Sequence, residues 1–243
     1  MEEFKSWRSY WYFEDAVKRK ARYIHDAEAQ AFLNAVADTA MKRVQAIPAQ
    51  SSLWRAQRGN DWQQGDEYTP DQEVPYPPER MKPRQDQASE RRANPKGIPY
   101  LYLASCRQTA LAEMRAGKGS LISVGLFKTR RDLQIVNCMT DDKIHIYYPD
   151  HEPPGGERER SVWTAIDMAF ATPVTSSDDV ADYVPTQILA ELFKTRGFDG
   201  VAYRSSLGSS HNIALFDLEA AELIDCSLFK VKDVRYEFES VGG

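Results

Sequence analysis

Paired cysteines, clustered histidines and long apolar runs are all missing from this 243-residue chain. Three cysteines, Cys106, Cys138 and Cys226, lie far apart without a CxxC pair, which argues against a disulfide framework and against a zinc site. The four histidines are equally scattered, so no metal or other cofactor is expected. No apolar stretch approaches the ~18–20 residues of a membrane span, and the first residues lack the features of a signal peptide. These absences predict a soluble, reduced, cytoplasmic protein with no membrane contact.

An excess of basic residues is also missing, because the net charge is −5. A protein built mainly to neutralise nucleic-acid phosphates needs a clear positive excess. One basic segment, "RMKPRQDQASERR" over residues 80–92, supports the alternative of an RNA-cleaving toxin, but acidic residues interrupt it. Nucleic acid is therefore not the expected partner.

The N-terminal part has the spacing of a helix. Apolar residues recur at intervals of three and four, which predicts a helix over residues 10–48 that ends at Pro48. The segment around Phe13, Val17 and Ile24 forms either a second helix or the start of the same one. Residues 56–99 follow, rich in proline and glycine and without helical or strand periodicity. We interpret them as a long loop, either a binding loop or lid or a disordered linker.

Beyond this loop, strands outnumber helices. Strands are expected near 100–104, 121–127, 133–137, 143–148, 199–203, 211–216 and 221–236, and a short strand is expected in "SSLWRAQ" at the start of the loop. Helices are expected near 106–116, 161–170 and 186–196, the last with Pro185 at its start and Gly197 after its end. This order predicts an α+β fold with mainly antiparallel sheet.

The stretch "IPYLYLASCRQTALAEMRAG", residues 98–117, places one carboxylate after an aromatic strand. Strand alternation puts Tyr100 and Tyr102 on one face of that strand and two leucines on the other. Ser105 and Gln108 form an S-x-x-Q capping box, which predicts a helix starting at Cys106. At 100° per residue, Glu113 lies on the flank of that helix. Spacing alone leaves open whether it is an exposed helix residue or faces a ligand.

Three motifs in order resemble the RES domain family, named for an Arg, a Glu and a Ser. They are "LWRAQRG", "RRANPKGIPYLYLASCRQTALAE" and "TQILAELFKTRGFDGVAYRSSLGSSHNIALF". The resemblance runs from Trp54 to Phe216 and implies an ADP-ribosyltransferase-like fold. It divides the chain into a helical extension, residues 1–48, and a RES domain, residues 49–243. Known members include bacterial toxins that consume NAD and are commonly encoded with an Xre-type antitoxin that blocks the active site.

The resemblance also implies roles for particular residues. Glu113 would hold a ribose hydroxyl of NAD and stabilise the positive charge that develops as the nicotinamide–ribose bond breaks. Tyr102 would orient the nicotinamide ring, and the Arg55 guanidinium suits the diphosphate. Arg92 is a second candidate for that anion.

Three further positions are left with open roles. Ser205 donates either to a phosphate or to Glu113, and Gln187 reaches either the ligand or nearby backbone groups. Tyr100 either helps Tyr102 or packs in the core. A triad of Ser205, His211 and Asp199 is not expected, because no G-x-S-x-G elbow is present.

The acceptor of the ADP-ribosyl group stays open. Inorganic phosphate would give ADP-ribose-1-phosphate, water would give ADP-ribose, and a protein side chain would be ADP-ribosylated. The family favours degradation of free NAD, by phosphorolysis or hydrolysis. A silent module that keeps the fold without activity is the further alternative, and Arg55, Tyr102 and Glu113 weigh against it. The N-terminal helices are candidates for forming a homodimer or docking a partner.

Overall fold

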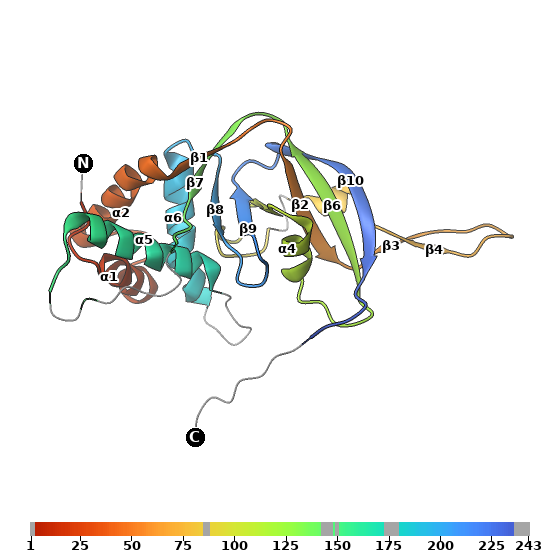
Figure 1. The fold of residues 1–243 in the computed structure, drawn as a ribbon, viewed down its shortest axis with the longest axis horizontal. Helices are drawn as coiled ribbons and strands as arrows, with labels where there is room; N and C mark the ends of the chain where they lie inside the picture. Colours follow the sequence, from red (N-terminus) through yellow and green to blue (C-terminus); the bar gives the residue numbers. More distant parts are fainter. Residues whose placement is uncertain (1–2, 85–87, 142–147, 149–150, 173–179, 236–243) are drawn as a thin grey trace, which may run out of the picture.

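A computed structural model describes residues 3–84, 88–141, 148, 151–172 and 180–235, and its centre is one eight-stranded sheet (Figure 1). The strand order is β1-β7-β8-β9-β5-β2-β6-β10. Their bounds are β1 (Val44–Ile47), β2 (Ser52–Arg58), β5 (Leu101–Ala104), β6 (Leu121–Thr129), β7 (Leu133–Asn137), β8 (Gly200–Arg204), β9 (His211–Leu215) and β10 (Ala221–Lys230). Neighbouring strands are antiparallel except β7 and β8, which are parallel and joined through the helices α5 and α6.

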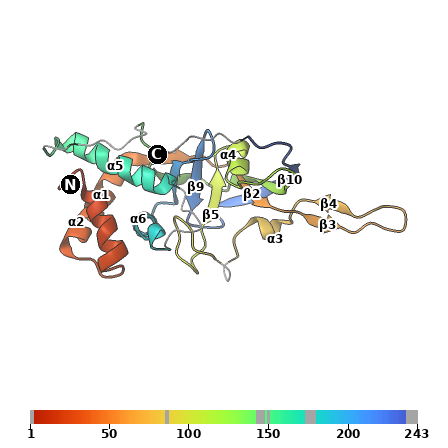
Figure 2. The same cartoon turned by 90° about the horizontal axis from the view of Figure 1, so that it is seen from below.

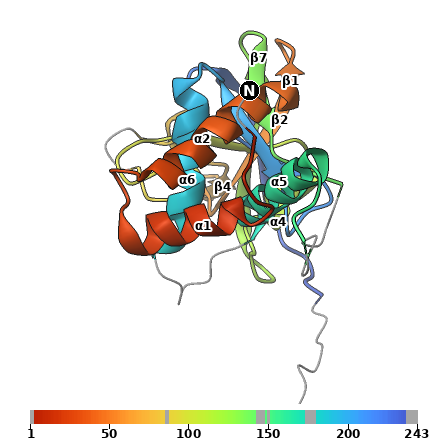
Figure 3. The ribbon, with the colours of Figure 1, turned by 90° about the vertical axis from the view of Figure 1, so that its left-hand side faces the viewer.

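The helices lie in two groups, as Figures 1 and 3 show. One group gathers at the β1–β8 end of the sheet: α1 (Ser9–Asp15), the π-helical turn η1 (Ala16–Lys20), α2 (Ala27–Ala40), α5 (Gly155–Ala171), η4 (Val180–Tyr183) and α6 (Val184–Thr195). The short α4 (Arg107–Ala112) packs on β2, β5 and β6 instead. The predicted α+β fold with mainly antiparallel sheet, flanking helices and N-terminal helices is therefore confirmed. Within the described chain, no helix has the length and apolar character of a membrane span.

Of the two alternatives for the start of the predicted helix over residues 10–48, the structure has a separate second helix, and the helix prediction is wrong at its C-terminal end. Ala21 is extended (φ −149°), and the carboxylate of Asp26 then caps α2 by accepting from the backbone N–H groups of Glu28 and Ala29. After Ala40 the chain tightens into the 3₁₀ turn η2 (Met41–Arg43) and continues as β1, because Val44–Ile47 pair with β7. β-Branched residues at both ends of this segment suit a strand.

The N-terminal helices share a core with the rest of the chain. Phe13, Phe32 and Val36 belong to the same buried cluster as Trp163 of α5 and Phe193 of α6. This cluster covers one face of the sheet, and a second apolar cluster containing Leu101 and Leu103 covers the other face. The boundary at residue 48 stays a prediction, but the helices before it pack directly on those after it.

The predicted loop over residues 56–99 contains regular structure. Its first part completes β2 and then forms the hairpin β3 (Asp61–Gln63) and β4 (Gln72–Val74), which projects from one end of the molecule (Figure 2). The one-turn helix α3 (Pro78–Met81) follows and buries Met81. Period-two alternation over three residues is too short to detect in sequence. Most of the strand predicted over 143–148 falls outside the described residues.

The sheet opens in its middle, between β5 and β2. In this pair Trp54 opposite Ala104 is the single registered residue pair, whereas β2 pairs with β6 over seven positions, from Ser52 to Arg58. On its other side β5 is fully paired with β9. The two halves of the sheet thus separate beside Tyr102, and this opening is the place where the predicted site residues meet.

Candidate active site

A cavity of about 680 Å³ lies over the opening between β5 and β2. Strands from both halves of the sheet line it, together with the end of α4. Three of the predicted residues, Arg55, Tyr102 and Glu113, share this cavity, and Arg92 also lines it. Residues from four separate segments of the chain are therefore brought to one place.

Glu113 stands at the C-terminal end of α4. The predicted capping box is wrong, because Cys106 is the N-cap: its sulfur accepts from the Thr109 N–H, while the Ser105 hydroxyl bonds to Ser210. The helix lasts six residues and ends at Ala112, so Glu113 is the C-cap residue. Its half-buried side chain leaves the helix end and enters the cavity.

One oxygen of the Glu113 carboxylate carries both of its hydrogen bonds. Ser205 Oγ donates to Oε1 at 2.7 Å, and Asn212 Nδ2 donates to the same atom at 2.6 Å. Oε2 has no partner within the part of the chain that the structure describes. Two neutral donors thus fix the carboxylate without neutralising it, and one oxygen is available to a ligand.

Ser205 is held so that it must donate to the carboxylate. Its oxygen accepts from the backbone N–H groups of Leu207 (3.2 Å) and Gly208 (2.8 Å), which leaves its proton for Glu113. This turn packs tightly on α4: a Cβ at Gly208 would lie 2.5 Å from Thr109 Oγ1. Of the two roles left open for Ser205, the contacts are those of orienting Glu113.

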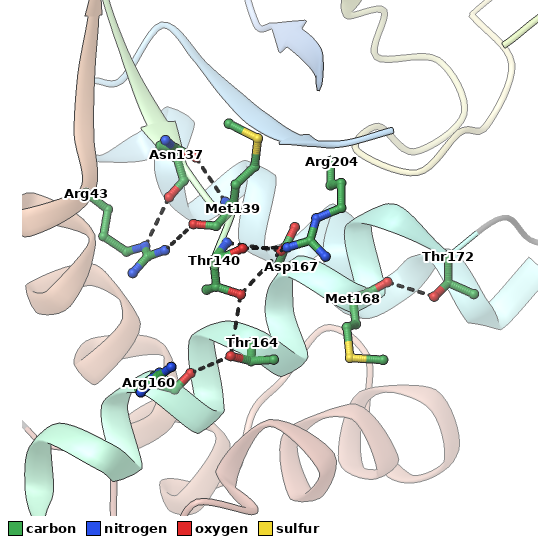
Figure 4. Close-up of polar contacts among 10 residues, drawn as sticks. All are labelled: Arg43, Asn137, Met139, Thr140, Arg160, Thr164, Asp167, Met168, Thr172 and Arg204. Carbon is green, nitrogen blue, oxygen red and sulfur yellow. Dashed lines mark hydrogen bonds and ion pairs between the residues drawn. The ribbon is translucent and has the colours of Figure 1, made fainter. Parts of the chain in front are cut away.

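Arg204, the residue before Ser205, connects the end of β8 to α5 (Figure 4). Arg204 Nη2 donates to Asp167 Oδ2 of α5 at 2.8 Å and to the Thr140 carbonyl. Thr140 N–H also donates to Asp167 Oδ2, at 3.1 Å. Asp167 is 1% exposed, and burial raises the pKa of its carboxyl despite these donors. The ion pair joins β8 to α5 immediately before the turn that begins at Ser205.

Tyr102 forms a fixed wall of the cavity. Its hydroxyl donates to Asn94 Oδ1 at 2.7 Å and accepts from the Ala93 N–H at 3.0 Å. Burial raises the pKa of this phenol well above its ordinary value, so it stays protonated. The Arg91 guanidinium lies over the ring, 5.7 Å from its centroid. The aromatic face is thus positioned by the polar tip of its own side chain.

Arg55 lies where β2 leaves β5. Its Nη1 donates to the Tyr102 carbonyl at 3.2 Å, taking the place of a strand partner at the opening. Its buried Nε has no partner in the described chain. Burial, followed by the like charge of Arg91, lowers the pKa of this guanidinium to about 10. Arg55 is still a cation at neutral pH, and an anion beside it would relieve both effects.

Arg92 and Gln187 hold backbone groups. Arg92 donates to the carbonyl oxygens of Phe170 and Thr172 at the end of α5, and its guanidinium lies 5.6 Å from the Tyr203 ring centroid. Gln187 Nε2 donates to the carbonyls of Arg91 (2.9 Å) and Asn94 (3.1 Å) and is outside the cavity lining. These contacts position the segment that carries Arg91 and Asn94.

Two other residues named from the sequence take structural places. Tyr100 is 1% exposed and packs on Phe216 with ring centroids 4.9 Å apart. Asp199 precedes β8, at the opposite end from Ser205, and its carboxylate binds Arg131 and the Gln134 N–H. A Ser-His-Asp triad is not formed.

Sequence reasoning missed Asn212, Tyr203 and Arg91 as cavity residues. Asn212 had a detectable signal, because an asparagine within the apolar strand "HNIALF" is unfavourable unless its amide is bonded. Tyr203 is buried, and the pKa of its phenol is raised to about 12 by burial. Arg91 and Arg92 are adjacent, and only the fold shows which of them faces Tyr102.

Among the described lining residues, Glu113 is the carboxylate of the assembled site, and Arg55 and the fixed ring of Tyr102 lie in the same cavity. No group of three or more potential metal ligands occurs among the described residues. A single carboxylate cannot act as the acid–base pair of an ordinary glycosidase, which needs two. It can stabilise a cationic sugar whose leaving group departs without protonation.

Comparisons with known proteins agree with the motifs. The model of the RES domain family matches residues 52–239. Among solved structures, the M. tuberculosis MbcT-MbcA toxin-antitoxin complex matches with a TM-score of 0.41 and 12% identity, covering 80% of this chain and 92% of that chain. No curated protein matches.

Proposed function

The chain belongs to the RES domain family, and from its site we propose that it cleaves NAD at the nicotinamide–ribose bond. One observation carries the proposal: Glu113 Oε1 is fixed by Ser205 and Asn212, inside a cavity that also presents Arg55 and Tyr102. Each group of the substrate has a partner of suitable chemistry there. The diphosphate is placed at Arg55, the nicotinamide ring at Tyr102 and the ribose at Glu113.

The chemistry requires little more than this set. The nicotinamide of NAD is a pyridinium, so it leaves as a neutral molecule with the electron pair of the broken bond and needs no proton. Positive charge develops on the ribose C1′ and its ring oxygen, and the Glu113 carboxylate stabilises it. A preorganised charge in a partly buried site contributes about 3–4 kcal/mol to such a step.

The bond to C1′ is completed by an oxygen of the acceptor. With inorganic phosphate the product is ADP-ribose-1-phosphate, with water it is ADP-ribose, and with a protein side chain it is a modified protein. We propose phosphorolysis or hydrolysis of free NAD, with phosphorolysis favoured by the family. Transfer to a protein shares the same first step and is the alternative.

Incubation of the pure protein with NAD, with and without inorganic phosphate, tests the proposal. Proton and phosphorus NMR would identify nicotinamide and the ADP-ribosyl product. Phosphorolysis should release nicotinamide only in the sample that contains phosphate, and hydrolysis should release it in both samples. The second product, ADP-ribose-1-phosphate or ADP-ribose, identifies the acceptor. If neither sample releases nicotinamide, and no added protein becomes ADP-ribosylated, the proposal fails.

The biological role we propose is that of a toxin held in check by an Xre-type antitoxin, as the family implies. Such a partner would cover the cavity that contains Glu113. Addition of a cognate antitoxin to the NAD assay should therefore stop nicotinamide release, and analytical ultracentrifugation would show whether the toxin binds it as a monomer or a homodimer.

A further inference from the structure

A second cavity, of about 440 Å³, adjoins the site. It shares Arg55, Arg91 and Tyr102 with the cavity described above, but Glu113 is not among its lining residues. Arg55 and Tyr102 therefore form a partition with the carboxylate on one side. A molecule that passes Arg55 would have one end at Glu113 and the other in this second cavity.

The second cavity is strongly basic. Arg80, Lys82 and Arg84 line it in addition to the two shared arginines, and Glu79 is the single carboxylate among its described lining residues. Arg80 lies over the Tyr76 ring, 4.1 Å from its centroid, which leaves its edge for an acceptor. Clustered cations of this kind suit a phosphate dianion, and arginine does so through paired hydrogen bonds.

Two buried donors have no partner within the part of the chain that the structure describes, and both belong to residues that line this cavity. They are Arg55 Nε and the hydroxyl of Tyr100, whose residue is 1% exposed. A buried donor that loses its water without gaining an acceptor destabilises the folded state. Acceptor oxygens of a molecule bound in the basic cavity would satisfy both donors.

The function proposed above decides which molecule this is. With the ribose at Glu113 and the diphosphate at Arg55, the adenosine end of the dinucleotide enters the basic cavity. An acceptor phosphate would have to stand at C1′ beside Glu113, on the other side of the partition. Resting on that function, we propose that the basic cavity binds a phosphate on the adenosine ribose, so that NADP is a substrate at least as good as NAD.

The chain offers a matched control for this proposal. Lys82 and Arg130 both pair with the carboxylate of Glu219, at 3.0 and 3.3 Å. Lys82 lines the basic cavity, whereas Arg130 lies outside both cavities. The double variant Arg80→Gln/Lys82→Gln removes two cavity cations, and Arg130→Gln removes a cation of the same surface pair.

Calorimetric titration with adenosine 2′,5′-bisphosphate and with 5′-AMP tests binding without any cleavage. We expect the bisphosphate to bind about tenfold more tightly, which is about 1.4 kcal/mol, because its second phosphate accepts charged hydrogen bonds from the basic cavity. The double variant should lose this preference, and Arg130→Gln should keep it. Equal affinities in the wild type, or a preference that survives in the double variant, would overturn the proposal whatever the enzyme does to NAD.

Cleavage assays add a second readout. We expect kcat/KM for NADP to equal or exceed that for NAD, and the double variant to lower it about tenfold more for NADP than for NAD. Cleavage of NAD alone would overturn the inference and leave the proposed function intact. A double variant that instead raises the KM for inorganic phosphate would assign the cavity to the acceptor and would also overturn it.

Discussion

Two carboxylates are held at the same end of β8, by consecutive residues, for different purposes. Arg204 binds Asp167 of α5, and Ser205 binds Glu113 at the end of α4. Asp167 is 1% exposed and paired with a cation, whereas Glu113 is half-buried, lines the cavity and is held by neutral donors. The negative charge of Asp167 is compensated by Arg204, whereas the negative charge of Glu113 is not compensated by its neutral donors.

Consecutive residues of the chain therefore take part in two kinds of contact: Arg204 stabilises the fold, and Ser205 orients the carboxylate of the candidate site. A charge that is already paired with the half-buried Arg204 guanidinium cannot stabilise a cation on a ligand. Neutral donors orient a carboxylate while its field still extends into the cavity. The ion pair of Arg204 with Asp167 in turn fixes the end of β8, directly before Ser205.

The largest expected effect is that of Glu113→Gln on catalysis. The amide keeps an oxygen for Ser205 but has no charge, so nicotinamide release should fall about 10²–10³-fold. The melting temperature should change little, because the side chain lies at a helix end. Chromatographic measurement of nicotinamide gives the rate, and Glu222→Gln on β10 is the control, with an unchanged rate. If the melting temperature instead falls sharply and the rate per folded molecule is unchanged, Glu113 has a structural role and not a catalytic one.

The next effect is that of Asp167→Ala on stability. Removal of one partner leaves the Arg204 guanidinium without its anion, which should lower the free energy of unfolding by about 3 kcal/mol. Urea denaturation followed by circular dichroism measures it. The surface pair of Arg131 with Asp199, at the other end of β8, is the matched control: Arg131→Ala should cost about 1 kcal/mol or less. Equal losses in the two variants would show that burial of Asp167 does not matter.

A smaller effect is expected for Ser205→Ala. Loss of one donor to Glu113 should lower kcat about tenfold with little change in KM, since the Ser205 hydroxyl already donates its proton to the carboxylate. Steady-state kinetics with NAD distinguish the two parameters. Ser206→Ala, at the exposed neighbouring position, should leave both unchanged. A rise in KM without a fall in kcat would place Ser205 on a phosphate instead.

The smallest effect is a pH dependence that Asp167→Asn should remove. Burial raises the pKa of Asp167 in the folded chain above the value of about 3.9 in the unfolded chain, so the folded state binds the proton more tightly. Wild-type stability should therefore decrease, relative to the Asn variant, as the pH rises through that acidic window. Urea denaturation at several acidic pH values measures the difference. A constant difference, or one of opposite slope, would contradict the assigned shift.

Much of the sheet could be predicted because local pattern determines it. Alternation in residues 100–103 correctly separates the tyrosines from the leucines, and the proline and glycine around α6 mark its ends. The switch from helix to strand at Val44 could not be predicted, since it depends on pairing with β7, some ninety residues later. Non-local partners decide such segments, whatever their own periodicity.

The site residues were predicted only in part, because some of their contacts also depend on non-local partners. Glu113, Arg55 and Tyr102 come from motifs, and the fold brings them into one cavity. The assignment of Arg92 over Arg91 is a matter of side-chain direction in an irregular segment, which no period describes. Asn212 donates to a carboxylate 99 positions earlier in the chain, so its role appears only when β9 and α4 are adjacent.

The opening between β5 and β2 leaves a cavity in the middle of the sheet. Beside Tyr102, the place of a neighbouring strand is taken by this cavity and by the Arg55 guanidinium, which donates to the Tyr102 carbonyl. A guest that fills this space can form, with the exposed edge, contacts of the kind that a missing strand would have made. In the proposed function, the incomplete pairing between β5 and β2 thus provides the binding site for the substrate.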